Sequence, residues 1–272
     1  APLAGWLMAF QDYKPAKGIF GSKWVGFKHF ITLFKEEQFY QALINTLGMS
    51  ILAIVFGTLC SITFAILLNE MRGVKYKKLV QTVSYLPHFV SWVVVANIVG
   101  QLLSPNGVVN ELLVNLHILK QPINFLAVPN MFWGIVTASD IWKETGWNAI
   151  IYLAAITGID MQLYEAAKVD GANRWQQIWN ITLPSIKGTI IILLIMNIGG
   201  LVNIGFEKQY LLGNNIVAEK SLVLDKYVLD YGIGMMRYSY GTAIGIFKSV
   251  VSIILIWFAN RLAKKSGEGQ LI

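Results

Sequence analysis

The stretch ALINTLGMSILAIVFGTLCSITFAILL, residues 42–68, decides the fold class of this chain. It contains no Asp, Glu, Lys, Arg or His over its whole length. The hydrocarbon core of a bilayer is about 30 Å thick, and about 20 apolar residues in an α-helix cross it. The stretch is therefore predicted to be a transmembrane helix. Its Cys60, the single cysteine of the chain, can form neither an internal disulfide nor a cysteine metal cluster.

Further apolar stretches lie on both sides of this one, and the whole composition agrees with them. The chain is 55% hydrophobic and 14% charged, whereas an ordinary soluble domain carries about 25% charged residues. The composition therefore argues against a water-soluble fold. Four more predicted spans are residues 80–103, 131–159, 186–206 and 242–262. We expect residues 3–10 to be the tail of a first span whose start is missing, which gives six spans in the native protein.

The basic residues predict how the chain crosses the membrane. Lys and Arg gather in residues 70–78 and at the C-terminus, where short basic segments mark the cytoplasmic side. Four crossings separate these two places, so both face the cytoplasm. The net charge of +7 does not indicate nucleic-acid binding, because the basic residues lie between long apolar runs and not on one polar face.

This topology places residues 11–41, 104–130 and 207–241 outside, and residues 160–185 inside. The chain contains no Gly- and Lys-containing phosphate loop. Any ATP must therefore be hydrolysed by another subunit. We find no repeat and no linker that would mark a second domain, and so expect residues 1–272 to form one transmembrane domain.

The segment YEAAKVDGANRWQQIWNITLP, residues 164–184, is patterned as two short helices. The first is predicted to run from about Gln162 to Asp170 and to stop at Gly171, which takes a left-handed conformation at little cost. Asn173 is predicted to cap the second, with Gln176 completing a capping box. The second helix has an apolar face, and Pro184 stands near the start of the next span; the face consists of Trp175, Ile178 and Trp179.

The spacing of Glu165, Ala166 and Ala167, then Gly171, then Ile181, Leu183 and Pro184 resembles the EAA loop of ABC importer permeases. In that family the loop forms coupling helices that lie in a cleft of the ATP-hydrolysing subunit. The resemblance implies this role for five residues: Glu165, Ala166, Ala167, Asp170 and Gly171. The alternative is an amphipathic helix that rests on the lipid surface. One departure is Asp160, which replaces the family's usual proline before the loop.

The resemblance extends over essentially the whole chain, to permeases of the maltose-transporter type and to their oligosaccharide and polysaccharide branch. It is carried by FQDYKPAKGIFGSKWVGFKHF at residues 10–30, Asn45-Thr46, Leu86-Pro87 and IGIFKSVVSIILIWFANRLAKK at residues 244–265. It implies an all-α, type I ABC importer permease fold in the bacterial cytoplasmic (inner) membrane. It also implies several partners: a second permease subunit, identical or different, two ATP-binding subunits that hold ATP and Mg²⁺, and an extracytoplasmic solute-binding protein.

Ionisable residues inside the predicted spans mark a pathway or a partner. Asp140, Lys143 and Glu144 share two turns of one span, and an internal ion pair between helices is the alternative. Asn197 and Asn203 lie six residues apart in the next span, and helix-to-helix hydrogen bonding is the alternative for them.

The resemblance to the maltose-type permease assigns sugar contacts to His88, Trp92, Lys143, Glu144, Trp147, Asn197 and Asn203. The indole rings offer flat apolar faces to a sugar ring, and the polar groups offer donors and acceptors to its hydroxyls. His88 could instead be a buried histidine beside the Pro87 kink. A cation at Lys143 would suit an acidic sugar.

The function indicated is a permease subunit that carries a sugar, most simply an oligosaccharide, and that is not itself an enzyme. Two rivals remain from the sequence. An ion-coupled secondary transporter would need an inverted repeat, and none is visible. An ABC permease for another small solute would carry the same loop.

Overall fold

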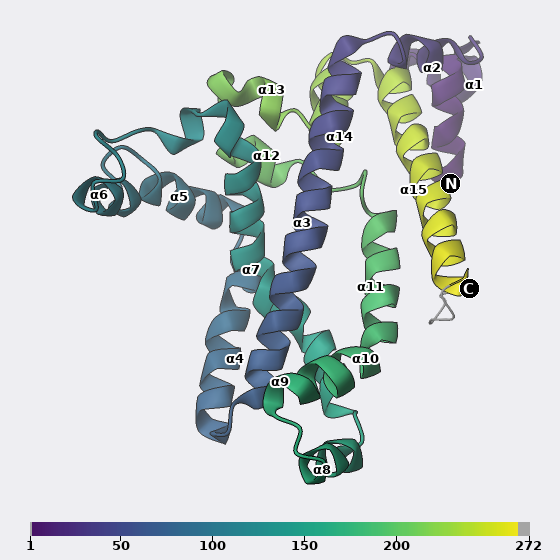
Figure 1. Ribbon diagram of the computed structural model, residues 1–272. Helices are drawn as coiled ribbons and strands as arrows, with labels where there is room; N and C mark the ends of the chain where they lie inside the picture. Colours follow the sequence, from purple (N-terminus) through teal and green to yellow (C-terminus); the bar gives the residue numbers. More distant parts are fainter. Residues whose placement is uncertain (1, 266–272) are drawn as a thin grey trace. The chain divides into compact units, whose positions relative to one another are not determined.

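The computed structural model describes residues 2–265, and within them nearly all regular structure is helical (Figure 1). The exceptions are two short strands, β1 (Gln11–Asp12) and β2 (Lys23–Trp24), which pair antiparallel. The chain divides into two compact units. The first consists of Ala1–Ile51, Trp92–Thr137 and Gly199–Leu255, and the second of Leu52–Ser91, Ala138–Ile198 and Ile256–Ile272.

The first unit contains both strands and a set of mostly short helices. The 3-10 helices are η1 (Pro2–Phe10), η2 (Pro15–Lys17), η3 (Phe125–Ala127) and η5 (Asn215–Val217), and a π-helical segment, η6, covers Val228–Gly234. The α-helices are α1 (Gly18–Gly21), α2 (Lys28–Leu33), α5 (Trp92–Leu102), α6 (Val108–Asn115), α12 (Glu207–Leu212), α13 (Ala218–Ser221) and α14 (Leu224–Tyr227), with parts of α3 (Glu37–Glu70), α7 (Pro129–Thr157) and α15 (Tyr238–Lys265).

A cluster of polar side chains around Glu36 connects distant parts of the first unit. Its carboxylate accepts hydrogen bonds from the hydroxyls of Tyr227 and Tyr240 and pairs with Arg237 at 2.8 Å. Burial raises the pKa of the Glu36 carboxyl, but the hydrogen bonds outweigh burial and leave that pKa below its ordinary value. Burial and the same contacts raise the pKa of Tyr227. The cluster joins residues about 200 positions apart in the chain.

The second unit contains the remaining parts of α3, α7 and α15 together with α4 (Val74–Phe89), α8 (Met161–Val169), α9 (Arg174–Gln177), the π-helical turn η4 (Ile178–Thr182), α10 (Leu183–Ser185) and α11 (Lys187–Gly199). Its main core joins α3 to α7. The buried members of that core are Ala65, Leu68, Ala149, Tyr152, Leu153, Ile156 and Ile186.

Two of the predicted spans form long apolar helices. Helices α3 and α15 contain residues 42–68 and 242–262 and are long and apolar enough to cross a membrane by length and composition. Among the described residues these two helices are candidate spans by themselves, and the number of candidate spans rises to four if each of two bent helix pairs is counted as one span. Helix α7, Pro129–Thr157, is one helix of 29 residues and covers the predicted span 131–159 up to Thr157. It carries Asp140, Lys143 and Glu144.

Two span predictions were wrong in detail. Residues 80–103 do not form one helix, because α4 ends at Phe89 and α5 starts at Trp92, with Val90 extended between them. The helix predicted over residues 186–206 ends at Gly199, where Gly200 follows and the conformational cost of continuing is high. The tail at residues 3–10 lies in the 3-10 helix η1.

Candidate functional site

The predicted coupling segment, residues 160–185, consists of two helical pieces joined by a tight turn. Asp160 caps α8, because its carboxylate accepts from the amide of Gln162 at 2.9 Å. At its other end α8 stops as predicted: Gly171 has φ of 81°, and the amide of Ala172 donates to the carbonyl of Ala167 at 2.8 Å. The residue that departs from the family pattern thus starts the helix that carries the motif.

The second piece begins with the predicted capping box. The amide of Gln176 donates to Oδ1 of Asn173 at 3.0 Å, and the amide of Asn173 donates to Oε1 of Gln176 at 2.7 Å. The helix then passes through the π-helical turn η4 and reaches Ser185. Pro184 has no amide hydrogen to donate. In the π-helical turn before it the hydrogen bonds reach five residues back, as from the amide of Leu183 to the carbonyl of Ile178. The helix from Arg174 to Ser185 meets α11 at a bend of 57°.

Side chains tie the two pieces to each other and to α3. The hydroxyl groups of Tyr164 and Thr182 lie 2.9 Å apart, and Gln177 donates to the carbonyl of Ala172 at 2.9 Å. Arg174 pairs with Glu70 at the end of α3 at 3.3 Å. Figure 1 shows α8, α9 and α10 as a connected group that leads into α11. A force on α8 therefore reaches α11 through direct bonds.

The coupling segment exposes several large apolar side chains. Trp175 and Trp179, predicted to form the apolar face of the second helix, are 72% and 66% exposed, and Val169 on α8 is 89% exposed. Glu165 and Asp170 are exposed as well. Within the second unit these groups do not enter the core. The exposed side chains of the segment thus include both apolar and acidic groups, as those of a contact site for another protein do.

Four of the predicted sugar-contact residues meet where α4 packs on α7. The ring of His88 stacks on Trp147 with centroids 4.3 Å apart and planes 2° apart. Because an ionised carboxylate only accepts, the Nδ1–H of His88 donates to Oε2 of Glu144 at 2.7 Å. The Lys143 ammonium lies 3.2 Å from Oε1 of Glu144 and donates to the carbonyl of His88 at 2.5 Å.

The close approach of α4 and α7 depends on Gly146. A Cβ atom at this position would lie 2.0 Å from the carbonyl oxygen of Ser84. Glycine therefore lets the backbones touch, and this contact sets the distance between His88 and Glu144. Lys143 is 5% exposed, and its ammonium contacts Glu144 and the carbonyl of His88 at the end of α4.

Glu144 and Asn197 line a cavity of about 230 Å³ within the second unit. Its walls come from α3, α7 and α11. They include polar side chains that the sequence analysis did not propose as sugar contacts, namely Thr58, Ser61, Asp140, Thr145, Asn148 and Tyr152. Thr58 and Ser61 stand three residues apart on α3, but no signal in the sequence singled them out, because the same helix also carries Asn45, Thr46, Ser50 and Thr63.

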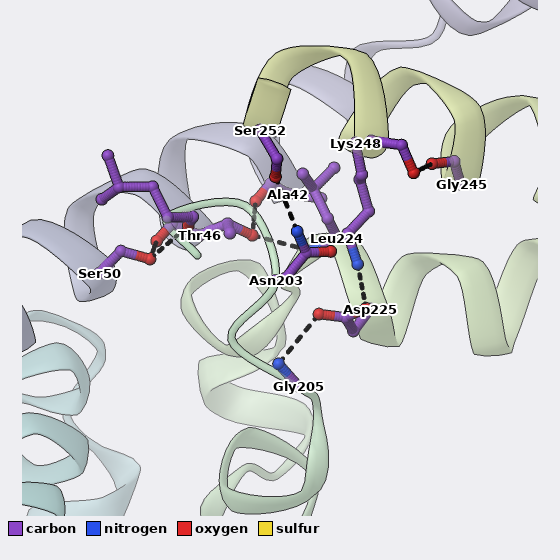
Figure 2. Close-up of polar contacts among 12 residues, drawn as sticks. Ala42, Thr46, Ser50, Asn203, Gly205, Leu224, Asp225, Gly245, Lys248 and Ser252 are labelled. Carbon is purple, nitrogen blue, oxygen red and sulfur yellow. Dashed lines mark hydrogen bonds and ion pairs between the residues drawn. The ribbon is translucent and has the colours of Figure 1, made fainter. Parts of the chain in front are cut away.

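The other two predicted contacts, Trp92 and Asn203, belong to the first unit. The Lys208 ammonium lies 5.6 Å from the centre of the Trp92 ring. Asn203 follows α11 and donates to the hydroxyl of Ser252 at 2.9 Å, as Figure 2 shows. Asp225 beside it accepts from the amide of Gly205 at 3.0 Å and pairs with Lys248. The predicted contacts thus divide between the two units.

The chain belongs to the family described as "binding-protein-dependent transport system inner membrane component", which matches residues 57–267. It is therefore a multi-pass membrane permease with the type I ABC importer fold.

The relatives and solved structures support this assignment over almost the full length. The chain is 48% identical to the polygalacturonan/rhamnogalacturonan transport system permease protein YteP of Bacillus subtilis, over 98% of this chain and 83% of that protein. It is 31% identical to the arabinooligosaccharides transport system permease protein AraP of the same species, over 97% and 82%. A crystal structure of a bacterial ABC transporter involved in the import of the acidic polysaccharide alginate matches with a TM-score of 0.88 and 43% identity, over 97% of this chain and 88% of that one.

Proposed function

We propose that this chain forms the translocation pathway of an ATP-driven importer for an oligosaccharide. Its relatives are named for the transport of polygalacturonan, arabinooligosaccharides and lactose, so the class of solute they share is a saccharide. A related structure contains a periplasmic protein bound to an alginate pentasaccharide. By analogy, a solute-binding protein would deliver the sugar to this permease from outside. A second permease would complete the pathway, and two partner subunits would bind ATP and Mg²⁺.

The single observation that carries the proposal is the exposed coupling segment. The motif residues Glu165, Ala166 and Ala167 lie on α8, which is capped at both ends and hydrogen-bonded to the helix leading into α11. An interfacial helix on a lipid surface would need its charges and apolar groups on opposite faces. Here Trp175 and Trp179 are exposed, and so are the acidic residues Glu165 and Asp170 of the same segment. This mixture fits a cleft in the ATP-hydrolysing subunit better than it fits lipid.

In this mechanism the coupling segment moves α11, and α11 carries Asn197 into the wall of the cavity. Sugar hydroxyls would bond to Glu144 and Asn197, and the exposed face of Trp147 would stack on a ring. Lys143 would act as a positioning residue, because its ammonium holds Glu144 and the end of α4. The loop at residues 70–78 and the C-terminal tail would lie in the cytoplasm.

The proposal is tested by reconstituting the transporter in proteoliposomes. Uptake of a labelled oligosaccharide should require ATP inside and the solute-binding protein outside. It should continue when ionophores collapse all ion gradients. Uptake that stops with the gradients and ignores ATP would instead support an ion-coupled carrier.

A further inference from the structure

The second unit contains an apolar groove on another side of α3 and α7, where α4 joins them. Its volume is about 850 Å³, and its lining comes from residues 59–67 of α3, 83–90 at the end of α4 and 141–146 of α7. None of its described lining residues is charged. We call it the α3–α4–α7 groove. Because these helices belong to a membrane permease, the groove requires an apolar occupant.

Large apolar side chains form much of the rim of the groove. Five of the lining residues are more than half exposed, namely Leu59, Leu67, Val83, Leu86 and Trp142. Helices that pack closely on each other in a membrane meet mainly through small residues. A flexible acyl chain adapts to branched side chains and an indole, so this rim favours lipid over a partner helix.

Basic residues stand at one end of the groove, in the turn between α3 and α4 and in the first turns of α4 (Figure 1). They are Arg72, Lys75, Lys77 and Lys78. None of the four pairs with a carboxylate of the described residues. Glu70, the one acidic residue of the stretch 70–78, pairs with Arg174 at 3.3 Å. This end of the groove therefore carries positive charge that the described part of the chain leaves unpaired.

The helical repeat of α4 brings this charge to the groove. Tyr76 lies seven residues before Val83 (83 − 76), about two turns, and so shares the face that lines the groove. Lys75 and Lys77 stand on either side of Tyr76, and Lys77 lies six residues (83 − 77) or about 9 Å before Val83 along the axis. Tyr76 is 71% exposed. A tyrosine flanked by lysines is typical of the headgroup level of a membrane.

We propose that the α3–α4–α7 groove is a binding site for an anionic phospholipid, with an acyl chain in the groove and the phosphate paired with Lys75 and Lys77. The groove buries apolar area, and the two ammonium groups select the charge of the headgroup. Each basic residue near a membrane surface strengthens the binding of anionic lipid by about fivefold. The site goes beyond the proposed function, because it does not depend on the solute that is carried.

The test measures lipid binding to the purified transporter, with all its subunits, by native mass spectrometry. The probes are phosphatidylglycerol and phosphatidylcholine with identical acyl chains. Phosphatidylglycerol should bind about 20- to 30-fold more tightly, the effect of two cations. Replacing both lysines together, Lys75→Gln with Lys77→Gln, should abolish this preference and leave the binding of phosphatidylcholine unchanged.

The matched control removes the same charge at the end of another helix. Lys264 and Lys265 belong to the last turn of α15 and do not lie near the lining of the groove in the chain. The double variant Lys264→Gln with Lys265→Gln should keep the preference for phosphatidylglycerol. An equal loss in the two double variants would show a general effect of basic charge and would overturn the site.

A second pair of variants tests the groove itself. Thr63 is an exposed residue of its lining, and Thr63→Phe should fill part of the groove and weaken the binding of both lipids by about tenfold, since about two CH₂ groups lose their burial. Val55→Phe is the control, because Val55 is exposed on the same helix but does not line the groove. A phosphatidylglycerol with a photoreactive group on its acyl chain should label residues 59–67 or 83–90 in the unmodified protein.

Equal binding of the two lipids, unchanged binding in Thr63→Phe or labelling confined to other segments would overturn the proposal. Displacement of phosphatidylglycerol by inorganic phosphate would assign the lysines to a soluble anion and would overturn it as well. If Thr63→Phe releases the second permease subunit and Val55→Phe does not, a helix of that subunit occupies the groove and the lipid site is wrong.

Discussion

Replacement of Gly146 by alanine tests the packing that positions the candidate site. The added Cβ would lie 2.0 Å from the carbonyl oxygen and 2.6 Å from the carbonyl carbon of Ser84, both backbone atoms. Ordinary contact needs about 3.5 Å, so α4 must move from α7 by about 1.5 Å. The bond from His88 to Glu144, now 2.7 Å, would then exceed the range of a hydrogen bond.

The expected loss of stability is large for a single methyl group. Overpacking costs about 1–3 kcal/mol, and the lost bonds to charged groups add about 1.5–3 kcal/mol. At about 2–4 °C per kcal/mol for a chain of this size, the melting temperature in detergent should fall by about 5–20 °C. Oligosaccharide uptake should fall further, because Glu144 is no longer held.

Gly134→Ala is the control in the same helix. A Cβ at Gly134 would meet nothing within 4 Å, and alanine favours a helix over glycine by about 1 kcal/mol. This variant should therefore melt at the same temperature as the unmodified protein or slightly higher. Equal melting temperatures for the two alanine variants would refute the close packing of α4 on α7.

Four further predictions concern other parts of the chain. Glu165→Lys should stay in the membrane but lose co-purification with the ATPase subunits, because it reverses a charge on exposed α8; normal co-purification and uptake would exclude the coupling role. In a cysteine-free background, a cysteine at position 215 should react with an impermeant reagent added outside and one at position 77 should not; the opposite pattern would invert the topology. Trp147→Ala should lower transport far more than protein level, because the ring stacks on His88 and leaves an exposed face; unchanged transport over a range of sugar concentrations would remove Trp147 from the site. Because the pKa of Glu36 is lowered in the folded protein, its stabilising contribution is present above the unfolded value of about 4.3 and is lost as the pH falls through the folded value; melting curves from pH 7 to pH 3 should show a smaller acid-induced loss in Glu36→Gln than in the unmodified protein.

The coupling segment could be predicted from the sequence almost residue by residue. Its signals are local: Gly171 supplies a left-handed conformation, and Asn173 forms a capping box with Gln176, three residues later. Such patterns depend on neighbours in the chain and not on tertiary packing. The break at Val90 was only partly predicted: the sequence analysis named a kink at Pro87, but not that one helix ends at Phe89 and the next starts at Trp92. Residues 80–103 are predominantly apolar, and hydropathy does not show where a helix bends.

The candidate site was only partly predictable. Charged and amide residues inside apolar stretches identified Glu144 and Asn197, which do line one cavity. The orientation of the Lys143 side chain could not be predicted, because its ammonium donates to the carbonyl of His88 in another helix. Gly146 gave no signal by itself either, since a glycine contact is visible only when the partner backbone is known. Whether these residues contact sugar stays a prediction.

The position of the bend before α11 explains how a small movement of the coupling segment can change the cavity. Ile186 stands at the bend and is 1% exposed, packed in the core that joins α3 to α7, so it acts as a fixed point. Asn197 lies eleven residues further along α11 (197 − 186), or about 16 Å at 1.5 Å per residue. A rotation of about 10° about Ile186 would therefore move Asn197 by about 3 Å, the length of a hydrogen bond. Such a movement is enough to make or break the proposed contact of Asn197 with a sugar hydroxyl while the core around Ile186 keeps its packing.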